Sequence, residues 1–188
     1  NTFVGFNAGA LNTTGLQNIN IGNNAGYSNT VGTCNVFIGN GAGYSQGTVS
    51  GNVFIGFHSG YSNSSGIRNT FVGNLSGRKN TTGIRNTFVG NIAGYSNTTG
   101  NYNSILGFSA GRLNTTGAYN TFIGDHSGDS STVGSFNVFL GFAAGELNTT
   151  GNYNVNVGGQ AGDLNTTGSC NTLLGGIAGY NNLVTGNT

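Results

Sequence analysis

Proline, methionine and tryptophan are absent from the 188 residues, and only five basic and four acidic side chains are present. Five Lys and Arg residues are too few to neutralise the phosphates of a nucleic acid, so the composition excludes a nucleic-acid partner. The lack of Pro excludes collagen, and the low charge excludes charge-rich disorder. Gly and Asn interrupt every apolar run well before the roughly 18 residues of a membrane span, so we expect no membrane insertion.

Gly and Asn are abundant instead, with 37 and 32 residues, and they recur with a period of seventeen. Every row of seventeen has Asn at position 1, Gly at positions 5 and 9, an aliphatic residue at position 4, and Ala or Ser at position 8. The rows begin at Asn1, Asn18, Asn35, Asn52, Asn69, Asn86, Asn103, Asn120, Asn137, Asn154 and Asn171. A flexible segment has no reason to keep this register, so we predict one ordered repeat array over residues 1–188, cut from a longer chain.

Each row is expected to form one coil of an all-β solenoid. Positions 2 to 4 read TFV, VFI or TFI, which are β-branched and aromatic residues bounded by Asn and Gly. We predict two short strands per coil, over positions 1 to 4 and about 6 to 10, joined by Gly and Asn-Thr-Thr-Gly turns. About eleven coils stacked about 4.8 Å apart would form a rod about 50 Å long. Asn187 and Thr188 resemble the opening of a twelfth row.

The Asn residues that open the rows are predicted to form a structural ladder between coils, because identical amides stack well in parallel β structures. The Asn of the late turn, as in Asn114 to Gly117, is expected to bond back to the backbone.

The predicted strands are apolar on both faces, so the pattern alone does not decide which face points into the core. We favour position 4 (Val4, Ile21 and onward) as the core. Position 3 then points outward as a self-association stripe of Phe3, Phe37, Phe54, Phe71, Phe88, Phe122 and Phe139. The competing assignment turns this Phe stripe inward and positions 2 and 4 outward. Either choice leaves an apolar outer face, so a second chain is expected to cover it.

The residues that commonly carry chemistry are scattered. Cys34 and Cys170 lie eight coils apart, about 38 Å, too far for an intrachain disulfide. A disulfide between chains is the alternative, and we favour buried thiols. His58 and His126 lie four coils apart and cannot share a metal ion. No nucleophile and base recur together, and the Asp pattern of calcium β-rolls is absent, so we predict no enzyme activity, metal or cofactor.

Position 10 carries two further patterns. Arg112 and Asp129 occupy it in adjacent coils, which predicts an ion pair. Elsewhere it holds a Tyr row that is either a partner-contact surface or edge packing, formed by Tyr27, Tyr44, Tyr61, Tyr95 and Tyr180.

The row N-T-F-[VI]-G-x-x-A-G-x-x-N-T-T-G resembles the head repeats of trimeric autotransporter adhesins. It is also similar to repeats of bacterial surface proteins and phage-type fibres that carry a C-terminal self-cleaving chaperone domain. The motif is present in Asn120 to Gly124, followed by Ser127. The resemblance implies a left-handed β-roll that trimerises side by side on an extracellular fibre.

We therefore expect a non-catalytic extracellular segment, on a cell surface or on the fibre of a virus-like particle. It would be an adhesin head or a filament subunit that associates with itself, as a trimer or end to end, and that meets a host surface protein or glycan. The alternative is a monomeric solenoid that binds ice or a small ligand. Ice binding is the less favoured, because Thr13 and Thr14 are adjacent in a turn and point apart.

Overall fold

The structure, a computed structural model, describes residues 1–181 and 185–186. The expected opening of a twelfth row at Asn187 lies outside the described residues. In the described part, the chain forms eleven short strands and no helix. The strands are β1 (Thr2–Val4), β2 (Ile19–Ile21), β3 (Val36–Ile38), β4 (Val53–Ile55), β5 (Thr70–Val72), β6 (Thr87–Val89), β7 (Ser104–Leu106), β8 (Thr121–Ile123), β9 (Val138–Leu140), β10 (Val155–Val157) and β11 (Thr172–Leu174).

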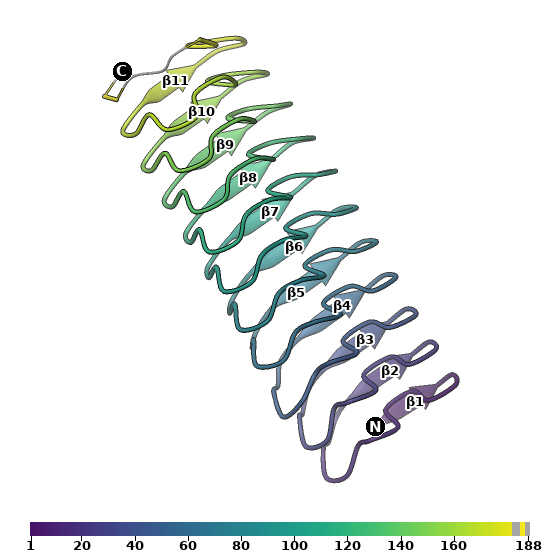
Figure 1. The fold of residues 1–188 in the computed structure, drawn as a ribbon. Coiled ribbons are helices and arrows are strands. Elements are labelled where there is room, and N and C mark those ends of the chain that lie inside the picture. Colours follow the sequence, from purple (N-terminus) through teal and green to yellow (C-terminus); the bar gives the residue numbers. More distant parts are fainter. Residues whose placement is uncertain (182–184, 187–188) are drawn as a thin grey trace.

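The eleven strands make one parallel sheet in sequence order, so the chain is a β-solenoid with one strand in each coil. Partners are seventeen residues apart throughout; Phe54 of β4, for example, pairs with Phe71 of β5. Figure 1 shows the coils rising like a staircase from the N-terminal to the C-terminal end, with the strands aligned in a single row. The predicted solenoid of seventeen-residue coils is thus confirmed.

The Asn at position 1 joins each coil to the next. Its Oδ1 accepts a hydrogen bond of 2.9–3.0 Å from the backbone N–H of the following position-1 Asn, at every step from Asn1 to Asn171. Its Nδ2 donates to the backbone carbonyl fourteen residues ahead, as Asn69 does to Gly83 at 2.8 Å. The ladder is therefore made of amide-to-backbone bonds, which satisfy buried polar groups at the start of each strand.

A second ladder runs along the late turn. The Nδ2 of Asn97 donates to the Oδ1 of Asn80 at 2.7 Å and to the carbonyl of Gly100 at 3.1 Å. The latter bond closes the turn back on itself, as the sequence predicted for this Asn. In the described part of the chain, both amide rows are buried from the second coil onward, so the uncharged Asn residues hydrogen-bond neighbouring coils inside the rod.

The second strand expected over positions 6 to 10 is absent from the described residues, because this segment forms consecutive turns. Positions 7 and 9 both adopt positive φ, as in Leu75 (57°) and Gly77 (56°), and extended strand geometry requires negative φ. The turns still bond to the next coil, for example from the N–H of Gly77 to the carbonyl of Ala93 at 3.0 Å. Neighbouring coils are therefore joined by hydrogen bonds from one strand and from the turns of each coil.

The Phe stripe of position 3 is the core, which overturns the favoured assignment of position 4 to the interior. The side chains of Phe37, Phe54, Phe71, Phe88, Phe122 and Phe139 are fully buried. Phe3, in the first coil, is 39% exposed. Neighbouring rings stack, with centroids 4.7 Å apart between Phe71 and Phe88. Because the buried rings are covered, they cannot serve as a self-association stripe.

The small residues of positions 8 and 9 explain why Phe turns inward. Gly43 adopts a left-handed conformation (φ 59°), and a Cβ there would lie 2.8 Å from the Phe37 ring. Ala42, beside it, is fully buried in the same cluster as Phe37. The ring therefore occupies the space that Ala and Gly leave empty.

Candidate functional site

The outer face of the sheet is formed by positions 2 and 4 of the eleven strands. Position 4 is Val, Ile or Leu in every coil, and position 2 is Thr, Ser, Val or Ile. These side chains alternate with the buried position 3 and are partly exposed along the whole sheet, as for Val4 (55%), Leu106 (48%) and Ile123 (41%). The outer sheet face therefore has a continuous aliphatic row at position 4, beside a mixed row of aliphatic and hydroxyl side chains at position 2, and it has no charged side chain.

A row of exposed aromatic side chains runs along position 17, which the sequence reasoning missed. It consists of Tyr102, Tyr119, Phe136 and Tyr153, in four consecutive coils. The rings stack 4.8–5.0 Å apart with interplanar angles of 4–5°. The stacking hides the ring faces and presents their edges to solvent. The signal was present in the sequence as four aromatic residues at one repeat position.

Arg85 continues this aromatic row toward the N-terminus. Its Nη1 donates to the Tyr102 hydroxyl at 2.7 Å, and its guanidinium carbon lies 5.3 Å from the Tyr102 ring centroid. Such a cation–π contact contributes about 0.5–1 kcal/mol at an exposed site.

The Tyr row of position 10 is partly exposed from Tyr27 to Tyr95, whereas Tyr180, farther along the rod, is exposed. Tyr27, Tyr44 and Tyr61 stack 4.9–5.1 Å apart. Arg78 then lies between Tyr61 and Tyr95, 5.6 and 5.9 Å from their ring centroids. These contacts match the edge-packing interpretation of the row, and the partner-contact interpretation stays a prediction.

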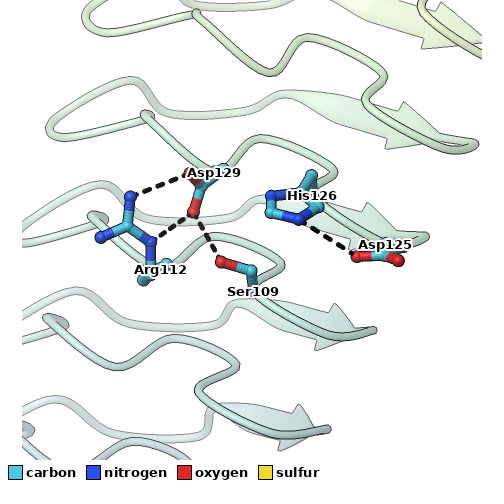
Figure 2. Close-up of polar contacts among 5 residues, drawn as sticks. All are labelled: Ser109, Arg112, Asp125, His126 and Asp129. Atoms are coloured by element: carbon cyan, nitrogen blue, oxygen red, sulfur yellow. Dashed lines mark hydrogen bonds and ion pairs between the residues drawn. The ribbon is translucent and has the colours of Figure 1, made fainter.

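From the seventh to the tenth coil, position 10 is occupied by charged residues, namely Arg112, Asp129, Glu146 and Asp163. Together with Ser109, Asp125 and His126 from neighbouring positions, they form what we call the charged corner. The predicted ion pair is present: Arg112 Nε and Nη2 donate to Asp129 Oδ1 and Oδ2 at 2.9 and 3.0 Å. The Ser109 hydroxyl donates to Asp129 Oδ1 at 3.1 Å. Figure 2 shows Arg112 and Ser109 converging on Asp129, while His126 Nε2 lies 3.6 Å from Asp125 Oδ1.

Burial and repulsion act on the acids of this corner. The pKa of Glu146 is raised, first by desolvation and then by the Asp163 carboxylate. Desolvation also raises the pKa of Asp163. The hydrogen bonding that Arg112 donates to Asp129 is the main reason that the pKa of Arg112 is raised. A single guanidinium thus faces several carboxylates that repel one another.

The sequence reasoning did not bring His126, Asp129 and Glu146 together, but the structure does. One ligand atom from each lies within 4.8 Å of the others. The chain turns between positions 7 and 10, which brings the side chains of His126 and Asp129 close together. The stacking of coils places Glu146, at position 10 of the next coil, beside them. His58, at position 7 four coils away, instead stacks on Phe57 at 3.9 Å.

Cys34 and Cys170 are free thiols, and both are exposed. The expectation of buried thiols is therefore wrong. The reason is that position 17 adopts positive φ and lies on the surface of the coil, with Cys34 at φ 58°. The Cys34 thiol donates to Gln17 Oε1 of the preceding coil at 3.1 Å.

The turn threonines differ in their availability. The Oγ1 of position 13 donates to the next coil, as from Thr81 to the Thr98 carbonyl at 3.0 Å, whereas Thr82 at position 14 is exposed. Among residues 1–181 and 185–186 there is no pocket, and none of them belongs to a helix that could cross a membrane. The features described above therefore lie on the outer faces of the solenoid.

Comparisons with the known protein families, with curated proteins and with solved structures find no match for this chain.

Proposed function

We propose that this chain is a non-catalytic structural or adhesive segment of an extracellular fibre, and that copies associate side by side through the outer sheet face. The observation that carries the proposal is the partly exposed aliphatic row of position 4, which follows all eleven strands on a sheet face without charge. Soluble monomers rarely expose apolar patches larger than a few hundred Å².

A second copy of the chain is the partner that fits this face. The copy presents the same side chains at the same interval between coils, so two such sheet faces share one repeat distance along the rod. Positions 2 and 4 contain no like charges that would repel across such an interface. The resemblance to trimeric fibres favours three copies around a common axis, outside the cell.

The proposal is tested by placing charges on the outer sheet face. Ile55→Lys with Val89→Lys adds two ammonium groups at position 4, on strands β4 and β6. The matched control, Thr99→Lys with Thr116→Lys, adds the same charge at exposed turn positions. Sedimentation velocity should show an oligomer for the native chain and for the control, and a monomer for the position-4 variant.

Two results would overturn the proposal. One is a native chain that sediments as a monomer at micromolar concentration, and the other is a position-4 variant that associates as strongly as the control. A monomer that also produced thermal hysteresis would instead support an ice-binding solenoid.

A further inference from the structure

His126 presents one ring nitrogen to solvent-exposed Asp125 and buries the other. Its Nδ1 is buried, and in the described part of the chain it has no hydrogen-bond partner. In Figure 2 this nitrogen lies on the side of the ring that faces Asp129, away from Asp125. Buried polar atoms are normally paired, so the unpaired imidazole nitrogen, on a side chain that is 36% exposed overall, is a free position at which a ligand can bind.

The carboxylates beside His126 have little compensating charge. Asp129 and Asp163 are both only 6% exposed. Arg112 pairs with Asp129, but within residues 1–181 and 185–186 no hydrogen bond or ion pair reaches the carboxylate of Asp163. Glu146 lies between them at position 10 of the intervening coil. A cation at this point would relieve the repulsion along the acidic row.

The donor set suits one kind of cation. Imidazole nitrogen and carboxylate oxygen are both ligands of zinc and its neighbours, whereas calcium takes six to eight oxygen ligands. Tetrahedral zinc ligands about 2.1 Å from the ion lie about 3.4 Å from one another. The three ligand atoms lie within 4.8 Å of one another, so each pair has to approach by at most about 1.4 Å to reach this spacing.

We propose that His126 Nδ1, Asp129 and Glu146 bind a divalent ion of the zinc class, with a fourth position open to solvent. Asp125 orients the imidazole from Nε2, as carboxylates commonly do behind a metal-bound histidine. Arg112 and Ser109 fix the Asp129 carboxylate; its Oδ1 accepts two hydrogen bonds, and its Oδ2 accepts one and keeps a lone pair for the ion. The ion would clamp the eighth coil, which carries His126 and Asp129, to the ninth, which carries Glu146.

The first test is zinc titration of the intact chain with Cys34→Ser and Cys170→Ser, because exposed thiols would bind the metal themselves. Calorimetry in a non-chelating buffer should give a single Zn²⁺ per chain. Nitrogen-15 spectra of the two imidazoles should show a large shift of His126 Nδ1 and an unchanged His58. No stoichiometric binding, or a shift at His58 alone, would overturn the proposal.

The second test compares matched histidine variants in the same background. His126→Gln and Glu146→Gln should each weaken zinc binding at least about tenfold, because each removes one of three protein ligands. His58→Gln changes the same repeat position four coils away and should bind zinc as the parent does. Circular dichroism without zinc checks that each variant is folded. Unchanged affinity in both ligand variants would contradict the site. The result does not depend on whether the chain forms fibres.

Discussion

The carboxylate of Asp129 accepts two hydrogen bonds, at 2.9 and 3.0 Å, from the guanidinium of Arg112 in the preceding coil. Both residues occupy position 10, so the stacking of coils alone places the two charges in contact. The side chain of Asp129 is 9% exposed and that of Arg112 is 37% exposed, which makes this a half-buried pair.

Removal of that guanidinium should destabilise the rod. We expect Arg112→Ala to lower the free energy of unfolding by about 1–2 kcal/mol, between the values typical of exposed and of buried pairs. Arg68→Ala is the matched control, because Arg68 is exposed and makes no ion pair among the described residues. Urea denaturation measures both, and equal losses would show that the contact with Asp129 contributes nothing specific.

The core assignment predicts very different costs for two nearby phenylalanines. Phe71 is fully buried between Phe54 and Phe88, and Phe57 is 48% exposed. Phe71→Ala should lower the free energy of unfolding by about 3–5 kcal/mol through the lost contacts and the cavity. Phe57→Ala should change it by less than about 1 kcal/mol. Chemical denaturation of the two variants decides, and a larger loss at Phe57 would reverse the assignment.

A polar residue in the Phe stripe offers a route to higher stability. Asn156 lies at position 3 and is fully buried, and neither its Nδ2 nor its Oδ1 has a partner in the part of the chain that the structure describes. Asn156→Leu should raise the free energy of unfolding by about 1–3 kcal/mol, because it removes an unsatisfied amide. Leu173, in the next coil, already occupies this position. A lower melting temperature for the variant would show that the amide is paired in solution.

His58 should give stability a dependence on pH. Its pKa is lowered from 6.5, first by desolvation and then by the charge of Arg78. The unfolded chain therefore takes up this proton at a higher pH than the folded chain. The stability that neutral His58 contributes is present above about pH 6.5 and is lost as the pH falls toward the lowered pKa.

The measurement is urea denaturation of the native chain and of His58→Gln, in buffer with a chelator, between about pH 7 and pH 5. The native chain should lose stability relative to the variant as the pH falls. A constant difference over this range would show that the pKa of His58 is the same in both states.

The features that follow from the repeat could be predicted from the sequence. The prediction was wrong where two alternative assignments have the same residue pattern. The Asn1 to Asn171 series and the Arg112–Asp129 pair follow directly from a seventeen-residue register. The choice of the inward face could not be predicted in this way. Phe37 and Ile38 are both apolar, so alternation along a strand of three residues does not show which of them points to the core. Gly43 supplied the missing signal, since the invariant Gly at position 9 is where a large ring needs space.

The candidate metal site could not be predicted from the sequence, because it depends on the turn over positions 6 to 10. An extended second strand separates positions 7 and 10, whereas left-handed residues such as His126 (φ 57°) fold the chain sharply. The side chains of His126 and Asp129 are thereby brought to one corner, and stacking adds Glu146. Spacing within a coil is therefore a poor guide to contact where non-Gly residues adopt positive φ.

The most direct test of the central claim, that the outer sheet face joins copies of the chain, is the molar mass of the native protein in solution. Light scattering across a dilution series should give a multiple of 19.0 kDa at micromolar concentration, with three copies favoured. A mass of 19.0 kDa at every concentration would contradict the account, because the apolar face of positions 2 and 4 would then be stable in water.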